Sequence, residues 1–128
     1  MSSYAYSAEY DPPAPVLEIV VAAVGRVNTT ALVDSGADVT LLPITLLDQI
    51  DAHYMHTQRL RGVVGGSQTV EIYRVNIEVA AQTIRGIRAV AAAARHEAIL
   101  GRDVLNQLVM TLHGPAEVLT LETSLDPS

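Results

Sequence analysis

The stretch ALVDSGADVTLLP, residues 31–43, places a carboxylate, a hydroxyl and a glycine between two apolar arms. Asp34 ends a predicted strand, and Gly36 gives the chain the freedom to fold back tightly past it. The backbone N–H groups of Ser35 and Gly36, together with the Ser35 hydroxyl, can donate hydrogen bonds to an ionised carboxylate. Apolar neighbours limit the access of water. A carboxylate held in this way can have its pKa tuned for acid–base chemistry.

The triplet Asp-Ser-Gly by itself favours a simpler interpretation, because these three residues are common in turns. Two other kinds of chemistry have less support. Ser35 as a nucleophile needs a partnered histidine, and nothing in the sequence ties His96 or His113 to it. His53 and His56 lack the further ligands at motif spacing that a zinc site requires. The sequence therefore predicts no metal site, and it leaves Asp34 as either a turn residue or a catalytic acid.

The elements that must position Asp34 are short aliphatic runs between turns. Hydrophobic residues make up 49% of the 128 residues, with no Phe and no Trp, so the core must be built from Val, Leu, Ile and Ala. Such runs favour an all-β domain. Single strands are expected at residues 16–23, 29–34, 39–42, 82–93 and 97–101. Hairpins are expected at 58–80, turning at Gly65-Gly66, and at 109–123, turning at Gly114-Pro115. Short helices are expected at 44–49, after Pro43, and at 102–108.

Composition and charge also indicate how the chain divides into segments and which classes of partner it does not bind. Residues 1–15 read as a flexible N-terminal head, residues 16–123 as one domain, and residues 124–128 as a tail. The formal charge of −6 argues against nucleic-acid binding. No apolar run approaches the roughly 20 residues of a membrane-spanning helix. The absence of cysteine excludes disulfides and a thiolate nucleophile. Without an export signal, the cytoplasm is the default location.

Three motifs follow one another at the spacing of a single domain: LVDSGADVTLLP, GVVGGSQT and AILGRDVLNQLVMTL. Together they resemble the retropepsins, the retroviral-type aspartic proteases, over residues from about Val16 to His113. The first and third motifs also echo each other, each running from an apolar pair through a glycine turn to an Asp. A plausible extra strand at 118–123 makes the chain more similar to cellular and bacterial members. The resemblance implies a closed β-barrel that forms a homodimer.

The resemblance also assigns roles to individual residues. Asp34 matches the catalytic aspartate, and Arg102 matches an arginine that pairs with the residue at Asp38. The residues that support the active site are Ser35, Gly36, Ala37, Asp38 and Arg102. The residues of the flap, which closes over bound peptide, are Val64, Gly65, Gly66 and Ser67. Ser67-Gln68 stand where retroviral flaps are more apolar, so substrate preference does not carry over.

The implied chemistry needs two carboxylates, and the chain has a single Asp-Ser-Gly. The resemblance therefore implies that two chains each contribute one Asp34 to a shared site, as a two-fold homodimer allows. The implied activity is hydrolysis of a polypeptide substrate by a water molecule activated between the two carboxylates, without a cofactor. One alternative is a catalytically silent version of the same fold, kept as a dimerisation or peptide-binding module. A second alternative is an inactive monomer released from a precursor, with residues 1–15 as the processed linker.

Overall fold

The fold is all-β with two short helices, and the computed structural model describes residues 1–61 and 66–122. The elements in chain order are β1 (Ser2–Ala5), β2 (Val16–Ala22), β3 (Arg26–Val33), β4 (Leu41–Pro43), α1 (Ile44–Gln49), β5 (His53–Arg61), β6 (Ser67–Val79), β7 (Gln82–Ala92), β8 (Ala98–Leu100), α2 (Arg102–Leu105), β9 (Val109–His113) and β10 (Val118–Glu122).

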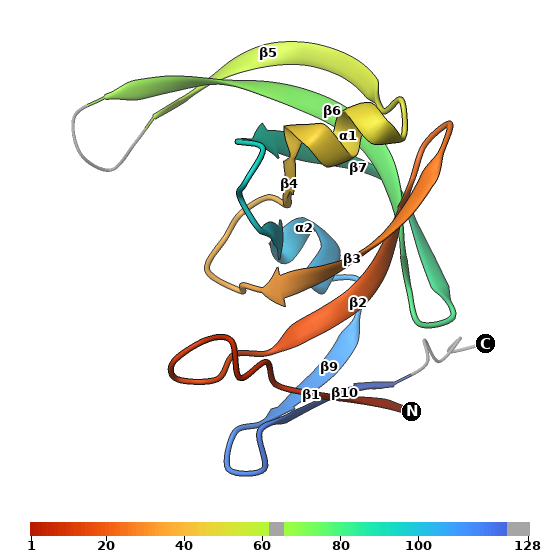
Figure 1. The fold of residues 1–128 in the computed structure, drawn as a ribbon, viewed down its shortest axis with the longest axis vertical. Helices are drawn as coiled ribbons and strands as arrows, with labels where there is room; N and C mark the ends of the chain where they lie inside the picture. Colours follow the sequence, from red (N-terminus) through yellow and green to blue (C-terminus); the bar gives the residue numbers. More distant parts are fainter. Residues whose placement is uncertain (62–65, 123–128) are drawn as a thin grey trace.

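Six of these strands form a closed barrel, as the sequence predicted. The strands pair in the order β2, β3, β8, β4, β7, β6, and β6 pairs back with β2 to complete the ring. β5 extends the sheet beyond this ring by pairing with β6, so the long β5–β6 hairpin arches over the barrel (Figure 1). Closure removes the free edges of the six barrel strands, and it fixes the ends of β3 and β8 relative to each other.

Aliphatic side chains fill the interior of the barrel, because alternate residues of a strand point to the same face. On β2, Leu17, Ile19 and Val21 are almost fully buried, while Glu18 between them is exposed. The same inward alternation recurs on β6 at Val75, Ile77 and Val79. Pro43 precedes α1, whose observed bounds are those predicted, and the helix contributes Leu46 and Leu47 to the core.

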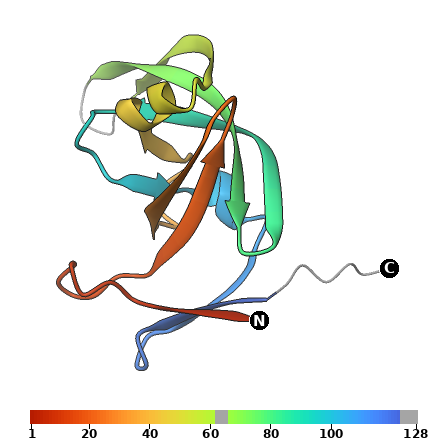
Figure 2. The ribbon, with the colours of Figure 1, turned by 45° about the vertical axis from the view of Figure 1, so that its right-hand side comes forward.

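A second, three-stranded sheet stands beneath the barrel (Figure 2). Its order is β1, β10, β9, with all pairs antiparallel. The predicted turn at Gly114-Pro115 connects β9 to β10, where the backbone N–H of Glu117 donates to the carbonyl of Gly114. Leu119 and Leu121 of β10 are buried and join the core of the barrel.

The expectation that ordered structure begins near Val16 is wrong. Residues 2–5 form β1, whose Tyr4 packs against the core. The Tyr10 hydroxyl donates a hydrogen bond to the carboxylate of Glu97, and this contact raises the pKa of Tyr10 to about 12. Pro15 accepts a hydrogen bond from the backbone N–H of Val33. The N-terminal segment is therefore tied to the rest of the chain, whereas a flexible head was predicted for residues 1–15. The predicted tail at 124–128 lies outside the described residues.

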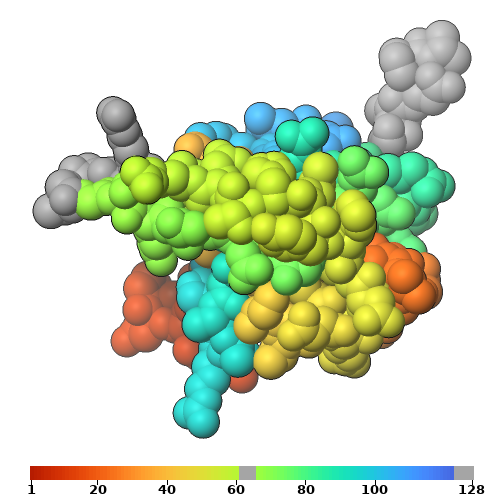
Figure 3. Space-filling view, turned by 90° about the horizontal axis from the view of Figure 1, so that it is seen from above, coloured from red at the N-terminus to blue at the C-terminus, as the bar shows by residue number. Residues whose placement is uncertain are grey.

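Several element boundaries also differ from the prediction, those of β5 and α2 among them. β5 begins at His53, five residues before the hairpin predicted at 58–80, so His53 and His56 belong to the strand. Helix α2 ends at Leu105, because the following residues form turns in which the N–H of Leu108 donates to the carbonyl of Leu105. Viewed from above, β5 and the adjoining part of β6 form a ridge that projects beyond the barrel (Figure 3). Among the described residues, no helix has the length and apolar character needed to span a membrane.

Candidate active site

The candidate site forms where two neighbouring parallel strands end. β3 and β8 pair in parallel with Val33 opposite Leu100, so the loops that follow them leave the same end of the barrel. These two loops belong to the first and third motifs, which echo each other in the sequence. The backbone N–H of Asp34 donates to the carbonyl of Leu100 at 3.1 Å, and the N–H of Arg102 donates to the carbonyl of Ala37 at 2.9 Å. Each loop is thus hydrogen-bonded to the other.

Asp34 is half-buried at the first position of its loop. Its Oδ1 accepts a hydrogen bond from the backbone N–H of Gly36 at 2.9 Å, and its carbonyl accepts one from the N–H of Ala37 at 3.1 Å. A Cβ on residue 36 would lie 3.2 Å from Oδ1, so glycine leaves the carboxylate the room to take this position. Within the described residues, no side chain or backbone group donates to Oδ2. One oxygen is therefore held, and the other is free to act on a ligand.

Arg102 braces the loop from the first position of α2. Its Nη1 donates to the carbonyl of Ser35 at 2.8 Å, and its Nη2 forms an ion pair with Asp38. The Asp38 side chain is 82% exposed, so the ion pair contributes little to the free energy of unfolding. Its geometric effect is larger, because the planar guanidinium fixes two points of one short loop.

Thr40 and Asp103 form a second brace that the sequence analysis did not identify. Thr40 is fully buried, and its hydroxyl donates to Asp103 Oδ1 at 2.8 Å and accepts from the N–H of Gly101 at 3.2 Å. The Thr40 N–H donates to Asp103 Oδ2 at 3.1 Å, and its carbonyl accepts from Val90 N–H of β7 at 2.9 Å. Thr40 thus connects its own loop to β7, the end of β8 and α2.

Gly101 makes this brace sterically feasible. A Cβ at this position would lie 2.5 Å from the backbone carbonyl of Val39, a distance that real structures do not show. The only signals for the brace in the sequence are the Asp after Arg102 and a Thr at the end of the aspartate loop. Neither signal identifies its partner without the fold.

The β5–β6 hairpin projects on the same side of the molecule as the β3–β4 loop (Figure 1). Gly66 and Ser67, predicted as flap residues, are both exposed; Ser67 is the first residue of β6 and Gly66 directly precedes it. Val64 and Gly65, the other two predicted flap residues, lie outside the described residues. The predicted hairpin therefore exists, with strands of 9 and 13 residues.

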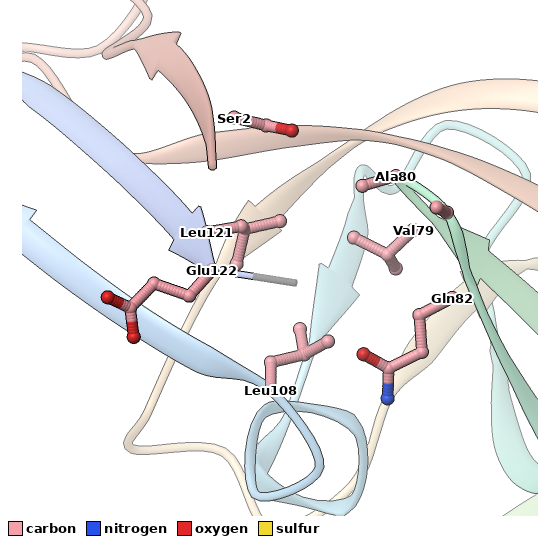
Figure 4. Close-up of a pocket in the computed structure, with 8 residues that line it drawn as sticks. Ser2, Val79, Ala80, Gln82, Leu108, Leu121 and Glu122 are labelled. Carbon is pink, nitrogen blue, oxygen red and sulfur yellow. The ribbon is translucent and has the colours of Figure 1, made fainter. Parts of the chain in front are cut away.

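In a single chain, much of the Asp34 loop is exposed to solvent. Ser35, Gly36 and Asp38 are exposed, while the flanking Val33 and Leu42 belong to the buried core. Three pockets of about 200 to 270 Å³ mark the surface, and Asp34 lines none of these three. One of them lies between the β6–β7 turn and the terminal sheet, with Leu108 and Leu121 among its lining residues (Figure 4). The expected apolar enclosure of the carboxylate is thus incomplete in one chain.

Solved structures share this fold at low sequence identity. A retropepsin-like aspartic protease from Rickettsia conorii matches with a TM-score of 0.69 and 14% identity, over 94% of this chain and 88% of that one. The EIAV protease in complex with the inhibitor HBY-793 matches with a TM-score of 0.53 and 20% identity, over 81% of this chain and 93% of that one. These similarities support the fold alone.

A comparison with curated proteins gave no match. The model of the family described as retroviral aspartyl protease matches residues 12–113, which include the β3–β4 loop, the β5–β6 hairpin and Arg102. This stretch covers most of the chain and contains the three motifs in their expected order. The chain therefore belongs to the retroviral aspartyl protease family.

Proposed function

We propose that this chain is an aspartic endopeptidase whose active site is assembled from the Asp34 residues of two identical chains. The observation that carries the proposal is the state of the Asp34 carboxylate, whose Oδ1 accepts from the Gly36 N–H while Oδ2 has no donor among the described residues. If Asp34 served only to form a turn, its loop would not need to be held both by Arg102 and by the Thr40–Asp103 pair. Family membership supports the same activity, since retroviral aspartyl proteases hydrolyse peptide bonds.

The chemistry requires a second carboxylate, and a two-fold homodimer supplies it from the same residue. Two carboxylates that share one site cannot both ionise easily, so one keeps its proton. The ionised Asp34 removes a proton from a bound water molecule, and the protonated Asp34 donates a hydrogen bond to the scissile carbonyl. Water then attacks the carbonyl carbon to give a tetrahedral diol, which collapses with transfer of a proton to the leaving amine.

The surrounding residues have supporting roles in this proposal. The exposed Ser35 hydroxyl is available to bridge the two loops across the two-fold axis. The β5–β6 hairpin offers backbone groups to an extended peptide, which can bind by strand addition. Gly66 has no side chain to obstruct this approach. Because the two carboxylates form one coupled pair, a pH–rate profile will report on the pair rather than on one residue.

The test is a cleavage assay on an unstructured protein across acidic to neutral pH, with the variant Asp34→Asn. An Asn side chain can still accept the hydrogen bond from Gly36 N–H, so the turn is retained while the acid is lost. We expect cleavage to fall by at least about 100-fold, and the wild-type activity to be inhibited by a statine-type transition-state mimic.

Asp48→Asn on α1 is the matched control, because it removes the same charge from an exposed position outside the loop. Cleavage should be unchanged in this control. If wild type never cuts while both it and Asp34→Asn dimerise and bind peptide equally well, the chain is a catalytically silent peptide-binding module and the proposal is wrong.

A further inference from the structure

Two arginines stand directly opposite each other on the outer face of the barrel. In the register of β6 and β7, Arg74 pairs with Arg88, and both side chains are exposed. Directly opposed residues of an antiparallel pair have Cβ atoms about 4.5–5.5 Å apart, and like charges at this spacing destabilise the sheet. The exposed His53 of β5 pairs with Arg74 from the other side. These three side chains form a row across three neighbouring strands, called here the Arg74 row.

No acidic side chain neutralises the Arg74 row. Within residues 1–61 and 66–122, the ion pairs involve Arg26 and Arg102, and neither Arg74 nor Arg88 forms one. Glu78, further along β6, is already paired with Arg26. Acidic residues outnumber basic ones in the chain by 14 to 8, so the opposed arginines do not reflect a shortage of acids. Their repulsion is a cost that a bound anion would remove.

A pocket of about 270 Å³ adjoins the row at the point where β6 changes its neighbour. β6 pairs with β5 up to Arg74 and with β2 from Asn76 onwards, and His53, Arg74 and Asn76 all line this pocket. Asn76 Oδ1 accepts a hydrogen bond from the N–H of Gly86 at 3.0 Å, so its amide NH₂ group remains to donate. Asp51 also lines the pocket and is the acidic group nearest to these donors in the lining.

We propose that the Arg74 row binds a compact dianion of the phosphate class, held over Arg74 between His53 and Arg88. A tetrahedral dianion presents separate edges to two planar guanidinium groups, whereas a single carboxylate fills only one such fork. A phosphate monoester carries a charge of about −1.5 to −2 at pH 7, which offsets both arginines. His53 in its neutral form and Asn76 each add an uncharged donor.

The site lies at the root of the β5–β6 hairpin. His53 and Arg74 form the pair farthest along the hairpin from Ser67, and β7 lies against β6 on the other side (Figure 1). A dianion bound there links β5, β6 and β7, and it requires only the folded chain. A ligand that binds the folded state alone raises the melting temperature. The site is therefore independent of the proposed function and of Asp34.

The test is a calorimetric titration of the whole chain with inorganic phosphate, at an ionic strength held constant with sodium chloride. Gln keeps much of the aliphatic stem of Arg and removes its charge. We expect the dissociation constant to rise at least about tenfold in Arg74→Gln and in Arg88→Gln. Glycerol 3-phosphate is the second probe. Tighter binding of this probe assigns the site to phosphate monoesters, and tighter binding of inorganic phosphate assigns it to the free ion.

Melting temperatures at fixed protein concentration give a second signature. In chloride alone, Arg74→Gln and Arg88→Gln should melt at or above the wild-type temperature, because each removes the contact between like charges. At about ten times the dissociation constant, phosphate should raise the wild-type melting temperature by roughly 4 °C and that of each variant much less. The order of stability then inverts between the two salts, which a general loss of folding cannot produce.

Two variants serve as controls. Arg95→Gln removes the same charge from the exposed loop between β7 and β8, so it should bind phosphate as wild type does. Asp51→Asn removes the acid from the pocket and should bind phosphate at least as tightly. Asn is suited to this position because it tolerates the positive φ of 51°.

Several results would overturn the proposal. They are unchanged phosphate affinity in Arg74→Gln and Arg88→Gln, an equal loss of affinity in Arg95→Gln, and weaker binding in Asp51→Asn. Acetate that binds as tightly as phosphate at the same ionic strength would exclude a site built for a dianion. None of these results depends on cleavage, so the anion site and the proposed function can fail separately.

Discussion

Thr40 shows how much of the candidate site depends on a single hydroxyl. It is the buried polar residue of the described core, and its side chain bonds both to the Asp103 carboxylate and to the N–H of Gly101. A buried donor or acceptor that loses its partner keeps the full cost of being removed from water. The hydroxyl is therefore important to stability as well as to the position of Asp34.

Replacing Thr40 by Val keeps the shape of the side chain and removes the hydroxyl. We expect the free energy of unfolding to fall by about 1–3 kcal/mol, measured by urea denaturation at fixed protein concentration. Thr30→Val is the matched control, because the Thr30 hydroxyl donates to Glu18 at 2.6 Å on the exposed face of the barrel. A loss in Thr40→Val no larger than in this control would show that the Asp103 brace does not stabilise the fold.

At the scale of elements, an ion pair links β3 and β6, the two strands that flank β2. Arg26, at the start of β3, donates from Nη2 to Glu78 Oε1 of β6 at 2.8 Å, and β2 pairs with both strands. The hydrogen bonds from Arg26 lower the pKa of Glu78 below its ordinary value of 4.5. A carboxyl with a lowered pKa in the folded state stabilises that state above its unfolded pKa.

This ion pair predicts a specific dependence of stability on pH. The contribution of Glu78 is fully present above pH 4.5 and is lost as the pH falls through the lowered pKa in the folded state. Glu78→Gln should therefore be less stable than wild type at pH 7, by a small margin because the pair is solvent-exposed. The difference should shrink as the pH falls below 4.5. Denaturation curves of both proteins across pH 2–7 test this, and a constant difference would contradict it.

The elements that the sequence predicted correctly are those with local signals. Pro43 set the start of α1, and aliphatic alternation located the barrel strands. β1 was missed because its partner, Val118–Leu121, lies more than a hundred residues away and its own composition resembles a linker. The Thr40–Asp103 brace was missed for the same reason, since it joins residues 63 positions apart. Asp34 and Arg102 could be singled out in advance because the motif that contains each of them is contiguous in the sequence.

At the scale of the whole molecule, the proposed dyad predicts that an inactive chain will inhibit an active one. When wild type and Asp34→Asn are refolded together in equal amounts, random pairing places half of the wild-type chains in mixed dimers. Activity per wild-type chain should then fall to roughly half, and further with excess variant. Asp48→Asn, mixed in the same ratio, should not reduce it. Unchanged activity per wild-type chain in the mixture with Asp34→Asn would show that one Asp34 is enough.

The bonding of Thr40 to β7, β8 and α2 has a consequence for how the protein loses activity. The loop that holds Asp34 cannot detach without breaking hydrogen bonds inside the barrel, so it belongs to the same cooperative unit. The amide hydrogens of Val90 and Gly101, which bond to Thr40, should then exchange with solvent only in globally unfolded molecules. Within each chain, the arrangement of the Asp34 loop and the integrity of the barrel are gained and lost in a single transition.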